Sequence, residues 1–157
     1  MLKDLVKDKQ GKLDKKKLLL VADQYIKEIE ENGEKELSLK GKSLEAANME
    51  NSSMQHYYEC VRVELNSVVK YVEFVIEKHR GAVFLYLTEK NQRDLSDRGK
   101  EKYIDSNDEL LELNECLIAI KEVHNKYQSI VDAFKNRGFQ LRNITELRIA
   151  QLNQDVM

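Results

Sequence analysis

The sequence contains no proline and no tryptophan, and only six glycines and two cysteines among 157 residues. Without proline or abundant glycine the chain is neither collagen-like nor low-complexity, and two cysteines are too few for a disulfide scaffold. Long hydrophobic runs are also missing, since the longest, Leu18–Ala22 and Ala82–Leu87, are far too short to span a bilayer. The length fits one domain, with or without a small extension.

An export signal is a further absence. Met1–Lys17 is rich in lysine, but aspartates interrupt it and no apolar segment with a cleavage site follows. We therefore expect a cytoplasmic protein in which Cys60 and Cys116 are reduced thiols that pack as small buried hydrophobes.

Neither sign of charge is in large excess. The chain has 26 Lys and Arg against 28 Asp and Glu, which gives a formal net charge of -2. Bulk charge alone therefore does not indicate a nucleic-acid-binding protein.

Motifs for catalysis are missing too. The sequence has no phosphate-binding P-loop, no dinucleotide-binding glycine motif, no Gly-x-Ser-x-Gly elbow, no His-Glu-x-x-His and no Cys-x-x-Cys. His56 with Cys60, and Cys116 with His124, are spaced like half metal sites, but closed zinc sites use tighter ligand pairs. We expect no enzyme, no catalytic residue, no metal and no cofactor, and we interpret His79 and His124 as hydrogen-bonded core histidines.

What the sequence does contain is glutamate, lysine and leucine at helical spacing, with no alternation typical of strands. Asn32-Gly33 and Arg137-Gly138-Phe139 are interpreted as helix stops, Ser106 with Glu109 as a capping box, and Thr88–Asp105 as a charged loop. The predicted helices are Lys12–Glu31, a short Leu44–Glu50 element, Met54–Leu87, a long helix from Ser106, and a last amphipathic helix with Leu141, Ile144, Leu147, Ile149 and Leu152.

The two longest of these helices carry apolar residues at alternating steps of three and four, which is the spacing of a helix–helix seam. The first seam runs from Val61 to Tyr86 and the second from Leu110 to Phe134. We predict an all-α fold, a long antiparallel helical hairpin with shorter flanking helices. The apolar stripes are wide for this chain length, so we expect part of them to meet another copy of the protein.

Basic residues interrupt the apolar part of the first seam helix. Lys70, Lys78 and Arg80 are either solvent-face charges or a phosphate-contacting strip, with Phe84 or Tyr86 nearby to stack on unpaired bases. The sequence pattern alone leaves both interpretations open.

Three segments, taken in order, resemble the UvsY family of phage recombination mediators over roughly residues 25–157. The most specific is Phe134–Arg148, which is similar to the family's C-terminal Arg-x-Phe-Gln-Ile-Lys-Asn pattern, and Ile104–Glu109 and Leu44–Asn48 also resemble family segments. We accordingly divide the chain into a charged N-terminal extension, 1–24, and a single helical domain, 25–157.

The resemblance implies a non-enzymatic homo-oligomer, a heptamer-like ring, that binds single-stranded DNA in the cytoplasm of a host bacterium. It implies loading of a UvsX-like strand-exchange recombinase onto DNA coated by single-strand-binding protein, with no membrane involved. Lys78-His79-Arg80 matches the family's Lys-x-Arg element, but the further charges and the glycine that follow it in the family are missing here. The DNA-binding residues expected from this match are Lys78 and Arg80, with Lys70, Lys90 and Arg93 in supporting positions. The residues expected at the oligomer interface are Phe134, Phe139, Leu141, Ile144 and Leu147.

Two other hypotheses stay open beside this one. The first is a helical scaffold or interaction protein that forms the same oligomer without binding DNA, which the acidic balance and the apolar Ala82–Leu87 run favour. The second is a small metal-dependent enzyme. Lysines in the extension, Lys12 and Lys15–Lys17, are candidates for an auxiliary DNA contact.

Overall fold

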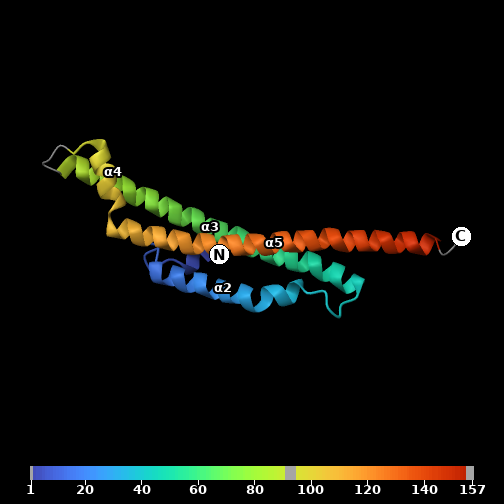
Figure 1. Ribbon diagram of the computed structural model, residues 1–157. Coiled ribbons are helices and arrows are strands. Elements are labelled where there is room, and N and C mark those ends of the chain that lie inside the picture. The colour runs from blue at the N-terminus through green and yellow to red at the C-terminus, as the bar shows by residue number, and fades with distance from the viewer. Residues whose placement is uncertain (1, 91–94, 155–157) are drawn as a thin grey trace. The chain divides into compact units, whose positions relative to one another are not determined.

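A computed structural model describes residues 2–90 and 95–154, and the side chains of all of these except residues 90 and 152–154. Its helices are α1 (Leu2–Leu5), α2 (Lys15–Leu37), α3 (Leu44–Lys90), α4 (Asp97–Asp105) and α5 (Asp108–Gln154) (Figure 1). The described residues contain no β-strand, only an isolated bridge between Lys7 and Leu13. The predicted all-α class and the long helix pair, α3 and α5, are confirmed.

Both long helices continue through positions where the sequence suggested breaks. α3 is one helix rather than a short element followed by a long one, and α5 runs through the predicted stop at Arg137–Phe139. In α5 the glycine is explained by close packing rather than by a helix stop, because a Cβ atom on Gly138 would lie 3.0 Å from Asn51 Nδ2. The predicted stop at Gly33 is wrong for the same reason: α2 continues to Leu37, and a Cβ on Gly33 would lie 2.8 Å from Ile130 Cδ1.

The connection between α3 and α5 also differs from the prediction. Part of the expected loop, Thr88–Asp105, forms α4, which begins after Ser96, whose side chain accepts a hydrogen bond from Gly99 N. Ser106 follows the end of α4 instead of capping α5. The α5 cap is the next residue, Asn107, whose Oδ1 accepts from Leu110 N at 3.1 Å.

The described residues form two compact units, to each of which α2, α3 and α5 contribute. The first unit comprises Met1–Gln24 with Glu64–Val123, and the second comprises Tyr25–Val63 with His124–Met157, in each case as far as they are described. The division into an extension, 1–24, and a domain, 25–157, stays a prediction.

In the first unit the N-terminal segment packs against α3 and α5. Leu2 and Val6 are buried, and Leu2 N donates to Glu64 Oε2 at 2.9 Å. Asp8 Oδ1 accepts from the backbone N–H groups of Gln10 and Lys12, which closes a turn, and Asp14 N donates to Val6 O. The other buried hydrophobic residues of this unit are Leu18, Ala22, Leu65, Val68, Val69, Val72, Ile76, Leu87, Ile104, Leu110, Leu113, Cys116, Ile120 and Val123.

The core of the second unit is aromatic. The Tyr58 ring lies 5.5 Å from Phe134 and 5.7 Å from Tyr127, whose ring is in turn 5.8 Å from Tyr25. The Tyr58 hydroxyl donates to Glu36 Oε2 at 2.6 Å. Each ring contributes a large apolar surface, so the cluster stabilises the unit, and the Tyr58 hydroxyl is not left without a hydrogen-bond partner.

Candidate nucleic-acid interface

The expected DNA-binding residues of α3 divide between two sides of the helix. Lys70 and Lys78 are exposed, whereas Arg80 is half-buried and donates from Nη1 to Asp105 Oδ1 at 3.0 Å. Residues two positions apart in an α-helix are separated by about 200° around its axis, so Lys78 and Arg80 project to nearly opposite sides. They line different hollows of the first unit.

The structure does not describe the side chains of the two supporting residues beyond Arg80. Lys90 is the last residue of α3, and its side chain is not described. Arg93 lies outside the described residues.

Two of the expected lysines flank an aromatic side chain on one side of α3. Phe74 is 62% exposed, although it is a large hydrophobe, and it lies four residues after Lys70 and four before Lys78. Residues four apart stack along one side of a helix with a rise of about 6 Å. Lys70, Phe74 and Lys78, here called the α3 stripe, therefore place an exposed ring between two exposed cations.

The folded N-terminal segment adds lysines beside the stripe. Lys3 Nζ lies 4.9 Å and Lys7 Nζ lies 5.6 Å from the centre of the Tyr71 ring, which is within cation–π range. The Tyr71 hydroxyl donates to the carbonyl oxygen of Gly11 at 3.2 Å. This bond and the buried Leu2 and Val6 fix the segment against α3.

A hollow of about 400 Å³ opens at the edge of the stripe. Its basic lining comes from Lys12, Lys15 and Lys78, and one acidic residue, Glu109, lies among them. Glu109 Oε2 is 3.5 Å from Nε2 of His79, and Lys15 pairs with Glu112 at 2.6 Å. The remaining lining residues are Gly11, Leu13, Tyr71, Phe74, Val75, His79, Ala82 and Leu113.

This surface suits an unpaired nucleic-acid strand better than a duplex. Phosphates need lysines spaced along a path, and unstacked bases need exposed aromatic faces. Phe74 is such a face, since Lys70 lies four residues before it on α3 and Lys12 and Lys78 line the same hollow. Phe84, which the sequence suggested for stacking, instead lies under Lys100, with 5.2 Å between the ammonium nitrogen and the ring centre.

The residues expected at the oligomer interface are of two kinds. Phe134 and Leu141 are buried in the core of the second unit, while Phe139, Ile144 and Leu147 are exposed. From residue 142 to residue 151 every α5 residue except Thr145 is exposed, and this end projects past the start of α3 (Figure 1). Ile144 and Leu147 are thus apolar side chains without cover from the described part of the second unit.

The structure places the candidate metal ligands without assembling a site. Cys60 Sγ lies 3.6 Å from His56 Nε2, and Cys60 is exposed, so the expectation that it packs as a buried hydrophobe is wrong. Cys116 is buried as expected, which raises the pKa of its thiol. Over residues 2–90 and 95–154, no group of three or more His, Cys, Asp or Glu side chains is arranged to hold a metal ion. In the same ranges no helix is long and apolar enough to cross a membrane.

Sequence reasoning missed Phe74, Tyr71, Lys3 and Lys7, whereas Lys12 and Lys15, which line the hollow, were among the candidates for an auxiliary DNA contact. The signal for Phe74 was present, since a lysine–phenylalanine–lysine spacing of four and four is visible in the sequence. No comparable signal places Lys3 and Lys7 beside Tyr71, because that contact depends on how residues 2–14 fold back.

Comparison with known proteins identified no relative: the sequence matches no protein-family model, and no curated protein or solved structure is significantly similar to it.

Proposed function

We propose that this protein is a non-enzymatic, single-stranded DNA-binding recombination mediator. The observation that carries the proposal is the α3 stripe, in which Phe74 is exposed between Lys70 and Lys78. Lys70 and Lys78 contact phosphates of the strand, and Phe74 stacks on a base. Arg80 is assigned a smaller part than the sequence suggested, because Asp105 already neutralises it.

Assembly into a homo-oligomer is part of the proposal. With a net charge of -2, one subunit has little long-range attraction for a polyanion, so binding by a single copy is weak. Several copies acting on one strand raise the effective concentration and turn weak sites into tight binding. The exposed apolar residues Ile144 and Leu147 support such self-association, and a ring is the arrangement that the UvsY resemblance suggests.

The partners come from the same resemblance. We infer that the DNA-bound oligomer presents the strand to a UvsX-like recombinase and weakens the hold of single-strand-binding protein on it. The site needs no metal or cofactor for this role, since holding a strand involves no covalent step.

The test is strand binding by variants of the α3 stripe. We expect Lys70→Ala with Lys78→Ala to weaken binding of a fluorescent oligothymidylate and to reduce its salt dependence. Phe74→Ala should cost about 1–3 kcal/mol, the usual value of one base stacked on an aromatic ring. Arg80→Ala is the matched control, a basic residue of the same helix on the opposite side, and should change binding little. Equal losses from Arg80→Ala and the double lysine variant would remove the stripe from the proposal.

The alternative function is a helical scaffold that self-associates without binding DNA. The exposed apolar end of α5, over residues 142–151, favours it as much as it favours the mediator. Sizing the protein with and without the oligothymidylate separates the two, because a scaffold elutes at the same volume in both runs.

A further inference from the structure

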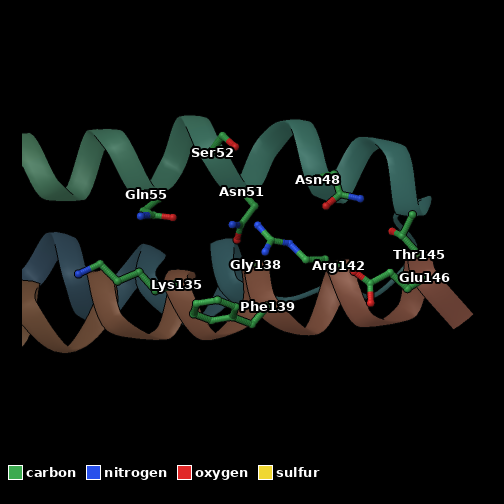
Figure 2. Close-up of a pocket in the computed structure, with 10 residues that line it drawn as sticks. All are labelled: Asn48, Asn51, Ser52, Gln55, Lys135, Gly138, Phe139, Arg142, Thr145 and Glu146. Carbon is green, nitrogen blue, oxygen red and sulfur yellow. The ribbon is translucent and has the colours of Figure 1, made fainter.

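A second basic and aromatic surface lies in the second unit, where α3 and α5 border a groove of about 720 Å³ (Figure 2). Figure 2 shows Asn51 and Gln55 of α3 and Arg142 of α5 extending into the space between the helices. The groove residues are Asn48, Asn51, Ser52 and Gln55 from α3, and Lys135, Gly138, Phe139, Arg142, Thr145 and Glu146 from α5.

The α3 side of the groove is a row of amides. Asn48, Asn51 and Gln55 follow one another at steps of three and four, so they share one side of the helix. Asn51 is held in place by Arg137, whose Nε donates to its Oδ1. Amides offer both donors and acceptors, which is what the edges of unpaired bases require.

The α5 side of the groove repeats the arrangement of the α3 stripe. Phe139 is 61% exposed, with Lys135 four residues before it and Arg142 three residues after it. Lys135 lies 3.4 Å from Asp132, whereas Arg142 forms no ion pair within the described residues. An exposed ring between two cations again matches a base flanked by phosphates.

We propose that this groove is a second binding site for single-stranded nucleic acid. A base stacks on Phe139, its edge meets the amides of Asn48 and Gln55, and Arg142 contacts a phosphate. The inference rests on the proposed function for the class of ligand, but it uses different residues in a different unit.

Other occupants fit the groove less well. An apolar helix would bury the amides of the groove without hydrogen-bond partners, which costs free energy. The exposed apolar side chains at the end of α5 also point away from the groove, so they do not extend it as an apolar docking surface. Ile144 lies two residues after Arg142 and therefore about 200° around the helix from it. An acidic peptide would leave Phe139 unused.

The absence of tryptophan allows a direct test. In the full chain, Phe139→Trp creates a single fluorescent reporter in the groove, and stacking of a base on it quenches its emission. We expect saturable quenching by a short oligothymidylate. Adding Arg142→Ala should lower the slope of log affinity against log salt by about 0.7, the value for one phosphate contact on a single strand. Met49→Trp is the matched control, an exposed position on α3 that does not line the groove, and should not respond.

Three outcomes would overturn the inference. The first is no quenching of Phe139→Trp while a Phe74→Trp reporter in the first unit is quenched, which leaves the proposed function intact. The second is quenching by polyglutamate but not by oligothymidylate, which assigns the groove to an acidic protein. The third is quenching of neither reporter, which removes the proposed function as well. Quenching of Phe139→Trp alone would support strand binding in the groove and contradict strand binding by the α3 stripe.

A substitution without a reporter provides an independent readout. Phe139→Ala should weaken binding of the oligothymidylate about 5- to 150-fold if the ring stacks on one base. Because Phe139 is exposed, helicity measured by circular dichroism should be unchanged. Affinity equal to that of the unmodified protein would contradict the inference.

Discussion

Arg137 and Asn51 form a buried pair in the second unit: Nε of Arg137 donates to Oδ1 of Asn51 at 2.7 Å, and Arg137 is only 5% exposed. The guanidinium also donates from Nη1 to the carbonyl oxygen of Glu36 at 2.7 Å, next to the end of α2 at Leu37. Burial lowers the pKa of Arg137, and Glu50 acts in the opposite direction. A buried cation is thus held by neutral oxygens, and α2, α3 and α5 are joined at one point.

Removing the amide should destabilise the second unit. Asn51→Ala leaves Arg137 Nε buried without an acceptor, so we expect the free energy of unfolding to fall by about 1–3 kcal/mol. Urea denaturation measures the loss. Asn48→Ala, at an exposed position one helical turn away, should change stability by less than about 0.5 kcal/mol. Equal effects of the two variants would contradict the structural role of the pair.

Gly138 should be intolerant of a methyl group although it lies inside a helix. Alanine normally stabilises a helix interior by about 1 kcal/mol relative to glycine. At Gly138 the new Cβ would lie 3.0 Å from Asn51 Nδ2, and Arg137 keeps that amide from moving away. We expect Gly138→Ala to lower the melting temperature. Gly81→Ala in α3, where nothing lies within 4 Å, should raise it. A rise in both variants would show that α3 and α5 are not closely packed at this point.

Tyr57 should ionise at a higher pH than an ordinary tyrosine. Its hydroxyl donates to Glu28 Oε1 at 2.6 Å, and this hydrogen bond, together with burial and the charge of Glu28, raises the pKa of Tyr57 to about 12. Because the unfolded state ionises first, near pH 10.0, the contribution of Tyr57 is complete below that pH and is lost as the pH rises towards 12. The stability difference between the natural protein and Tyr57→Phe should therefore shrink over this range. A constant difference up to pH 12 would contradict the hydrogen bond to Glu28.

Self-association should depend on the exposed apolar residues at the end of α5. We expect Ile144→Asp with Leu147→Asp to lower the molar mass measured by light scattering, with helicity unchanged, because both side chains are exposed. Leu20→Asp, an exposed apolar position of the first unit, is the control and should keep the original mass. Unchanged mass in the Ile144 and Leu147 double variant would place the interface elsewhere.

Phe134→Ala should act differently, by unfolding the protein. Phe134 is fully buried, and such truncations lower the free energy of unfolding by about 3–5 kcal/mol.

Hydrophobic spacing predicted the helical fold and the long pair well, because the seams from Val61 and from Leu110 are dictated by which residues must be buried. Helix ends were predicted worst. Gly33 and Gly138 look like stops in the sequence, but each provides room for a side chain from a neighbouring helix, and only the packed structure reveals that neighbour.

The candidate interface was predicted in part. Lys70 and Lys78 were singled out from their place in an apolar helix, and both are exposed. Their role in binding stays a prediction. Pairing Lys78 with Arg80 followed the family pattern rather than helical geometry, which separates them by about 200°. The positions of Lys3 and Lys7 near Tyr71 could not be predicted from the sequence, because tertiary contacts of Leu2, Val6 and Gly11 bring these lysines there.

The measurement that tests the central claim most directly is the affinity of the full-length protein for an oligothymidylate at about 50 mM and about 200 mM salt, with a duplex of equal length beside it. We predict binding of the single strand that weakens steeply between the two concentrations, and weaker binding of the duplex, whose bases cannot stack on Phe74. Absence of binding at the lower salt concentration, or an affinity that does not change with salt, would contradict the claim that the α3 stripe holds a DNA strand.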